Sequence, residues 1–170
     1  MSTKPQNREE LAELFHELGF KIGAEIGVLG GDYSAFMCQT NPDLKLFCID
    51  SWGTGEHKKR EYHLRKYEEA KVKLAPYNTT IIYKLSMDAV KDFADRSLDF
   101  VYIDANHEPQ FVEEDIREWS KKVKVGGIVS GHDYALRLAK VVDEYIKDHD
   151  LDLQLTTLES ENISWWFFNK

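Results

Sequence analysis

Strand-like and helix-like segments alternate along the whole chain, and this alternation leaves few folds open to it. Short apolar segments such as LKLFCID (44–50) and LDFVYID (98–104) are separated by segments with apolar residues at helical spacing. Strands that alternate with helices form a mainly parallel sheet, because each connection must cross over one face of the sheet. The sequence therefore predicts an α/β protein with a doubly wound sheet of seven mainly parallel strands and helices on both faces.

The patterns continue without a repeat, a linker or a low-complexity segment, so we expect a single domain over residues 1–170. An N-terminal helix is expected within residues 1–20, because Asn7 is a good N-cap and Gly19 ends the apolar stripe. The core is expected to occupy residues 21–170. Strands are predicted within 21–28, 44–50, 79–85, 98–104, 125–131, 153–159 and 164–169, and further helices at 32–39, 59–74, 87–94, 112–123 and 138–145.

The charge and composition exclude several partners. The formal net charge of −8 disfavours nucleic acid, because a nucleic-acid-binding face needs clustered Lys and Arg. No apolar segment approaches the roughly 18 residues that a membrane span needs, and the first ten residues, MSTKPQNREE, are polar. Cys38 and Cys48, the only cysteines, lie in apolar segments, which favours reduced and buried thiols. We expect a cytoplasmic protein with no nucleic acid and no membrane partner.

A glycine-rich segment, AEIGVLGGDYS, joins the first predicted strand to the next helix. Gly27 lets the backbone turn out of the strand, and Gly30 and Gly31 allow a ligand to approach closely. Leu29 stands where the dinucleotide-binding pattern has its second glycine, which disfavours a nicotinamide-dependent enzyme. The alternative for this segment is a plain strand-to-helix turn.

Acidic and small polar residues end or follow the first three predicted strands, whose carboxyl ends lie along one edge of the sheet. In such sheets ligands bind at that edge, where the strand order reverses. The carboxylate of Glu25 would repel a pyrophosphate but suits a cationic ligand group. Asp50 ends the second strand, where a carboxylate can accept hydrogen bonds from a ribose diol. Ser86 and Met87 could border an adenine, although Met87 is also suited to ordinary packing.

The order of Glu25, glycine loop, Asp50 and alternating strands and helices resembles the class I S-adenosylmethionine-dependent methyltransferases, which have a Rossmann-like sheet. The segments FVYIDANHEPQ and GGIVSGHDY are similar to the small-molecule O-methyltransferase branch, whose motif has Asp-Gly-x-His and then Gly-Gly before His-Asp. Ala105 stands where that motif has glycine. Asp115 is expected in a structural ion pair and Trp119 in the core. The matching residues are Asp104, His107, Asp115, Trp119, Gly126, Gly127, His132 and Asp133.

The resemblance implies S-adenosyl-L-methionine as the cofactor, with a divalent metal, Mg²⁺ or Mn²⁺, held by Asp104, His132 and Asp133. Such a metal would favour the alkoxide form of the acceptor hydroxyl. Without a metal, His107 could take the hydroxyl proton. Asp104, His107 and His132 are thus the candidate catalytic residues, although each could instead cap a helix or bind a buried carbonyl. The candidate cofactor-binding residues are Glu25, Gly27, Gly30, Gly31, Asp50, Ser86, Met87 and Asp104.

We expect an enzyme that methylates a hydroxyl of a small molecule, such as a sugar or a phenol. Two alternatives are a cofactor-binding module without transfer activity and an interaction protein that uses its aromatic C-terminal segment, SWWFFN, as the binding face. A second copy of the chain, in a homodimer, could supply a wall of the acceptor site. The segment at 51–63 is expected to close over the site, where Lys58, Lys59 and Arg60 would favour an anionic acceptor.

Overall fold

The computed structural model of the chain describes residues 4–53, 60–158 and 163–170. Its strands are β1 (Ile22–Ile26), β2 (Lys45–Asp50), β3 (Thr79–Tyr83), β4 (Leu98–Ile103), β5 (Val123–Gly131), β6 (Gln154–Leu155) and β7 (Trp165–Phe168). Its helices are α1 (Arg8–Glu17), α2 (Asp32–Thr40), α3 (Arg60–Leu74), α4 (Ser86–Ala89), α5 (Pro109–Ser120) and α6 (Leu136–Asp148), with a 3₁₀ turn, η2 (Val90–Asp92). The helix predicted at 87–94 is thus divided between α4 and η2.

The described residues form one seven-stranded sheet in the order β3-β2-β1-β4-β5-β7-β6. Strands β1 to β5 pair in parallel, and β7 runs antiparallel to both β5 and β6. β1 is central, because Glu25 lies opposite Cys48 of β2 on one side and Tyr102 of β4 on the other. The strand order reverses between β1 and β4, which is where such sheets bind ligands. The predicted doubly wound sheet is confirmed.

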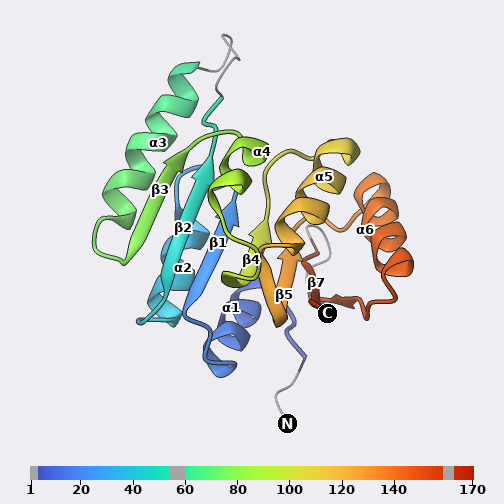
Figure 1. The fold of residues 1–170 in the computed structure, drawn as a ribbon. Coiled ribbons are helices and arrows are strands. Elements are labelled where there is room, and N and C mark those ends of the chain that lie inside the picture. Colours follow the sequence, from blue (N-terminus) through green and yellow to red (C-terminus); the bar gives the residue numbers. More distant parts are fainter. Residues whose placement is uncertain (1–3, 54–59, 159–162) are drawn as a thin grey trace.

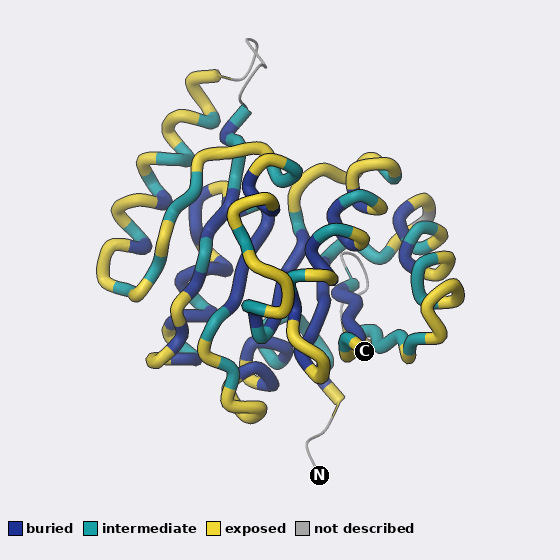
Figure 2. The backbone as a smooth tube through the Cα atoms, in the orientation of Figure 1, coloured by how far each residue is buried: buried dark blue, intermediate teal, exposed yellow. Residues whose placement is uncertain are grey.

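Helices cover both faces of the sheet (Figure 1). On one face α1 and α3 pack against α2, and on the other α4 and α6 pack against α5. Two apolar layers result, one with Phe15 stacked on Phe100 and the other around Ile116 and Trp119. The central strands are buried along their length, whereas the outer surfaces of the helices are exposed (Figure 2). At the start of α1, Oδ1 of Asn7 accepts the N–H of Glu10 at 2.8 Å, so the predicted cap is confirmed.

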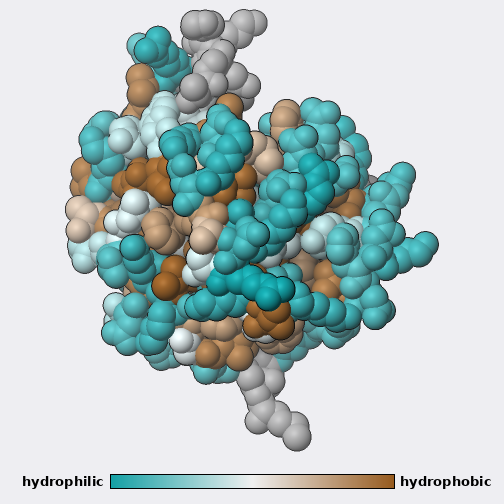
Figure 3. All heavy atoms as spheres, viewed as in Figure 1, coloured by the Kyte–Doolittle hydropathy of each residue, from teal (hydrophilic) through white to brown (hydrophobic). Residues whose placement is uncertain are grey.

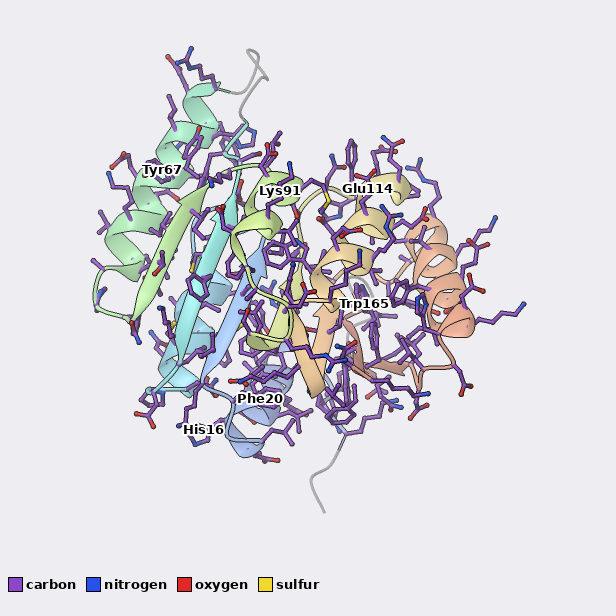
Figure 4. The ribbon with its side chains drawn as sticks, in the orientation of Figure 1. His16, Phe20, Tyr67, Lys91, Glu114 and Trp165 are labelled. Atoms are coloured by element: carbon purple, nitrogen blue, oxygen red, sulfur yellow. The ribbon has the colours of Figure 1, made fainter. Side chains whose placement is uncertain are left out.

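The aromatic segment at the C-terminus is part of the sheet rather than a surface for a partner. Trp165, Trp166 and Phe167 are buried, and Phe168 is 46% exposed. Trp165 packs between the sheet and α6 (Figure 4). This burial weakens the alternative in which SWWFFN forms an interaction face.

The strand predicted at 153–159 is limited to the two residues of β6. The physical reason is a competing set of hydrogen bonds. The backbone N–H groups of Thr157 and Leu158 donate to the carbonyl of Gln6, so the chain leaves the sheet to bind the segment before α1.

The surface in the view of Figure 3 has small apolar groups separated by charged and polar side chains. Each helix in the described ranges is too short or too polar to cross a membrane.

Candidate active site

A cavity of about 910 Å³ opens at the carboxyl ends of β1, β2, β3 and β4. This volume is near the upper end of the roughly 300–1,000 Å³ range of small-molecule sites. Its walls come from the loops after these strands, and α1 and α5 add side chains. Among the predicted site residues, those that line it are Glu25, Gly27, Gly30, Asp50, Ser86, Met87, Asp104 and His107.

Two glycines of the loop after β1 serve contacts within the protein. Gly27 has φ +95°, and a Cβ there would lie 2.1 Å from the carbonyl oxygen of Asp104. Gly31 has φ +79° and begins α2, where a Cβ would meet Leu74 and Ala70 of α3 at 3.2–3.3 Å. Gly31 is not one of the described residues that line the cavity, so its absent side chain serves helix packing here, and its part in the approach of a ligand stays a prediction.

The carboxylate of Asp50 accepts three backbone N–H groups. Its Oδ2 accepts from Val28 at 2.9 Å and from Leu29 at 2.8 Å, and its Oδ1 accepts from Trp52 at 2.7 Å. Leu29 and Trp52 have φ +50° and +40°, a left-handed conformation that costs energy for residues other than glycine. Asp50 therefore stabilises two strained loops. A carboxylate has about four acceptor positions, so after these three hydrogen bonds about one position remains for a ligand. Its binding to a ribose stays a prediction.

Glu25 is buried at the end of β1, and its Oε2 accepts the hydroxyl hydrogen of Ser34. Burial raises the pKa of Glu25 to about 8, although the hydrogen bond from Ser34 acts in the opposite direction. Asp104 and Asp50 raise this pKa further, and Arg8 lowers it. Glu25 is thus mainly protonated at neutral pH, and a cation beside it would favour the carboxylate.

Ser86 connects two residues of α5. Its hydroxyl donates to Oδ1 of Asp115 and accepts the indole N–H of Trp119 at 2.8 Å. Burial raises the pKa of Asp115 to about 6, and the hydrogen bond from Ser86 lowers it. Asp115 forms no ion pair with any described residue, so the expected ion pair is corrected to the hydrogen bond with Ser86. Trp119 is fully buried, as predicted. Asp115 and Met87 both line the cavity.

Asp104, His107, His132 and Asp133 converge after β4 and β5 and are called here the His–Asp cluster. Nδ1 of His107 lies 2.6 Å from Oδ2 of Asp133, and Nδ1 of His132 lies 3.2 Å from Oδ1 of the same residue. Asp133 has φ +56°, and strained backbone of this kind is frequent at functional sites. Burial raises the pKa of Asp104, and the nearby His132 lowers it. A carboxylate-held imidazole at a cavity wall is suited to moving a proton.

The His–Asp cluster also has the donor set of a metal site. One ligand atom from each of Asp104, His107 and Asp133 lies within 4.8 Å of the others. The predicted set had His132 in place of His107, and Nδ1 of His132 lies 3.8 Å from Oδ2 of Asp104. Two carboxylates and one imidazole fit a divalent cation, with Mn²⁺ favoured over Mg²⁺ by the nitrogen. Residues of the cluster thus fit the metal that the resemblance implies.

Several cavity residues were not predicted from the sequence. Phe111 and Asp115 lie four positions apart on α5, so helical spacing alone places them on one face. Arg8 lines the cavity from α1, and nothing in the sequence indicates that α1 approaches the end of β1. His63 of α3 also lines it and belongs to the segment 51–63 that was expected to close over the site, of which residues 54–59 lie outside the described residues. In the predicted basic cluster, Lys58 and Lys59 lie outside the described residues, and Arg60 is exposed at the start of α3.

The seven-stranded sheet, with its cavity at the point where strand order reverses and acidic residues at the ends of β1 and β2, defines a Rossmann-like methyltransferase fold. A family model described as a methyltransferase domain matches residues 24–134, more than half of the chain. The chain therefore belongs to this methyltransferase family, and the predicted class I S-adenosylmethionine-dependent methyltransferase is confirmed. A comparison with curated proteins finds no match.

Solved structures of other methyltransferases superpose on most of the chain. An O-methyltransferase from Bacillus cereus in complex with S-adenosylhomocysteine is 13% identical, with a TM-score of 0.70 over 98% of this chain and 82% of that one. TomG from Streptomyces achromogenes, an O-methyltransferase of tomaymycin synthesis in complex with S-adenosylmethionine, is 15% identical, with a TM-score of 0.70 over 96% and 80%. An rRNA methylase from Streptococcus thermophilus is 16% identical, with a TM-score of 0.68 over 99% and 98%. At these identities the likeness establishes the fold.

Proposed function

We propose that this protein transfers the methyl group of S-adenosylmethionine to a hydroxyl oxygen of a small molecule. The observation that carries the proposal is the contact of 2.6 Å between Nδ1 of His107 and Oδ2 of Asp133, at the wall of a cavity that also contains Glu25. Oxygen methylation needs removal of the hydroxyl proton, and this pair supplies a base for it.

The contact with Asp133 sets the roles of the two ring nitrogens of His107. Because Nδ1 faces a carboxylate, its hydrogen is donated to Asp133, and Nε2 keeps its lone pair. Bound S-adenosylmethionine supplies an electrophilic methyl group on its sulfonium sulfur. Nε2 of His107 takes the hydroxyl proton as the C–O bond forms and the S–CH₃ bond breaks. The ring then returns its proton to solvent, to which the His107 side chain is 56% exposed.

The cofactor is expected to lie along the carboxyl ends of β1, β2 and β3. Glu25 and Asp50 both line the cavity, which supports binding of the cationic amino group by Glu25 and of a ribose hydroxyl by the remaining acceptor position of Asp50. Ser86 and Met87 border the flat base. Two of the structural neighbours are complexes with S-adenosylmethionine or S-adenosylhomocysteine, which supports the same ligand here.

A divalent cation is the second way to activate the acceptor at this site. Asp104 and Asp133, with His107 or His132, would hold it, and it would favour the alkoxide form of the hydroxyl. A His107 that binds the metal through its ring cannot act as the base at the same nitrogen. The two versions of the mechanism therefore assign different roles to this residue and can be separated by experiment.

We propose a sugar or a phenol as the acceptor. The net charge of −8 disfavours an RNA acceptor, although one structural neighbour is an rRNA methylase. A homodimer in which a second copy closes the acceptor side is the proposed assembly. The cavity volume of about 910 Å³ lies near the upper end of the range for small-molecule sites. This volume supports the proposal that an acceptor binds beside the cofactor.

The test begins with calorimetric titration of the protein with S-adenosylmethionine and S-adenosylhomocysteine. Catechol and UDP-glucose then serve as probes of the two acceptor classes, with S-adenosylhomocysteine measured by mass spectrometry. We expect cofactor binding and acceptor-dependent product. His107→Ala should lower the rate by about 10²–10⁴-fold, whereas His149→Ala, an exposed residue at the end of α6, should leave it unchanged. Absence of cofactor binding would refute the proposal, and binding without turnover would favour a binding module.

A further inference from the structure

A guanidinium from α1 and a carboxyl group from β1 line the same cavity. Arg8, the first residue of α1, and Glu25, near the end of β1, both line it. Lys84 is a second cation among the described lining residues, but it follows β3, two strands away from β1, and pairs with Asp92 at 2.5 Å. A cation thus lines the same cavity as a buried acid that another cation beside it would ionise.

Contacts with α2 fix the position of Arg8. Its guanidinium carbon lies 5.1 Å from the centre of the Tyr33 ring, and the Tyr33 hydroxyl donates to the Arg8 carbonyl at 2.7 Å. Nε of Arg8 also lies 3.5 Å from Oε1 of Glu9. Tyr33 belongs to the first turn of α2, directly after the glycine loop, and its ring packs on Tyr102 of β4. The side chain of Arg8 is therefore held against α2, whose Asp32 and Tyr33 also line the cavity.

Arg8 also acts electrostatically on two acidic groups that line the cavity. It lowers the pKa of buried Glu25 and that of Asp104, although burial raises both. Such effects require proximity, because charge interactions decline with distance and are screened by water. Arg8 and Glu25 thus line one cavity and interact electrostatically.

We propose that Arg8 binds the carboxylate of the methionine portion of the cofactor while Glu25 binds its ammonium group, so that the two residues select an α-amino acid zwitterion. The inference rests on the proposed function, since it names a residue for that same ligand. A guanidinium presents paired N–H donors that match a carboxylate, and a charged partner strengthens these bonds. The N-terminal helix α1 thereby becomes part of the cofactor site. The sequence does not show this role, because α1 and the glycine loop are separate segments of the chain.

Three ligands that differ at one end test the proposal. S-adenosylmethionine has both the carboxylate and the ammonium group, decarboxylated S-adenosylmethionine lacks only the carboxylate, and 5′-methylthioadenosine lacks both. Arg8→Met keeps an apolar stem on Tyr33 and removes the charge. In calorimetric titrations we expect it to weaken S-adenosylmethionine about 10- to 100-fold and to change the other two ligands less than about twofold.

Two further variants control for charge and folding. Arg137→Met removes the same charge from the exposed surface of α6 and should leave every affinity unchanged. Arg8→Lys retains the charge but not the paired donors, so it should fall between the wild type and Arg8→Met. Thermal unfolding of each variant shows whether the fold is intact.

The possible outcomes separate this proposal from the proposed function. Equal weakening of all three ligands by Arg8→Met would show that Arg8 only supports the cavity wall, and unchanged S-adenosylmethionine affinity would show that the carboxylate binds elsewhere. Either result overturns the inference and leaves the proposed function standing. A wild-type protein that binds none of the three ligands would overturn the proposed function itself.

Discussion

Oδ2 of Asp50 accepts the backbone N–H of Leu29 at 2.8 Å and so holds this residue at φ +50°. We predict that Asp50→Ala weakens S-adenosylhomocysteine binding by about 1–3 kcal/mol and lowers the free energy of unfolding by a similar amount, because three backbone N–H groups lose their acceptor. Calorimetry and urea unfolding measure the two effects. Asp43→Ala, which removes an exposed carboxylate beside Lys21, should change both by less than about 0.5 kcal/mol. Unchanged ligand affinity in Asp50→Ala would place the ribose elsewhere.

Glu25 predicts proton release when the cofactor binds. Its pKa is raised to about 8, so the group is mainly protonated at pH 7, and an ammonium group beside it favours the carboxylate. Affinity for S-adenosylmethionine should therefore rise with pH, by up to about tenfold per unit below pH 8. Titrations in phosphate and Tris, which differ in ionisation enthalpy, count the protons. Glu25→Gln should remove the release, and 5′-methylthioadenosine, which has no ammonium group, should show none in the wild type; a release that persists in either case contradicts the assignment.

Two buried acids predict how stability depends on pH. The pKa of Glu25 is raised from 4.5 to about 8 and that of Asp115 from 3.8 to about 6, so the folded state binds more protons than the unfolded state in these ranges. Their contribution to stability is complete below pH 4 and is lost as pH rises through 8. Urea unfolding measures the free energy of unfolding at pH 5 and at pH 8. This free energy should decrease less between the two pH values in Glu25→Gln than in the wild type. For Asp115→Asn, the pH dependence of the free energy of unfolding should differ from that of the wild type only between pH 4 and pH 6. If this free energy depends on pH in the same way in all three proteins, both assignments are refuted.

The contact between the loops after β1 and β4 predicts an intolerant glycine. In Gly27→Ala the new Cβ would lie 2.1 Å from the carbonyl oxygen of Asp104, at φ +95°. We expect a loss of at least about 2 kcal/mol in the free energy of unfolding, from overpacking and backbone strain together. Gly126→Ala is the matched control, because its φ is +80° but nothing lies within 4 Å of its Cβ. It should lose only about 1 kcal/mol, and equal losses in the two variants would show that the contact is unimportant.

Binding of Mn²⁺ decides how the His–Asp cluster works. Titration with Mn²⁺, followed by electron paramagnetic resonance, should give a site that Asp104→Asn and Asp133→Asn weaken at least about tenfold, as expected for loss of a ligand or its support. Comparison of His107→Gln with His132→Gln identifies the third ligand. If the wild type shows no such site and EDTA leaves methyl transfer unchanged, His107 acts as the base without a metal.

Much of the fold could be predicted because it depends on local patterns. The β-branched segments, the cap at Asn7 and the alternation of strands and helices specify the sheet directly. β6 was overestimated because the hydrogen bonds of Thr157 and Leu158 to Gln6 join segments that are distant in sequence. Propensity contains no information about such contacts.

The site was predicted best where its residues follow strand ends. Glu25, Asp50, Asp104 and His107 all line the cavity, since parallel strands bring their carboxyl ends to one edge. The sequence could not show that Gly31 also gives space to α3, because a positive φ has the same sequence signature whether a ligand or a helix needs the space. Arg8 was missed because its place depends on how α1 packs against α2, which is a tertiary property.

The position of β7 has a consequence for synthesis on the ribosome. This strand follows β6 in the chain but inserts between β5 and β6, where it buries Trp165, Trp166 and Phe167. Until residues 165–168 emerge from the exit tunnel, β5 is an open edge that can pair with another nascent chain. The cofactor loops, by contrast, depend on β1 to β4 and can form earlier. The nascent protein can thus acquire its ligand-binding half before it is protected from aggregation.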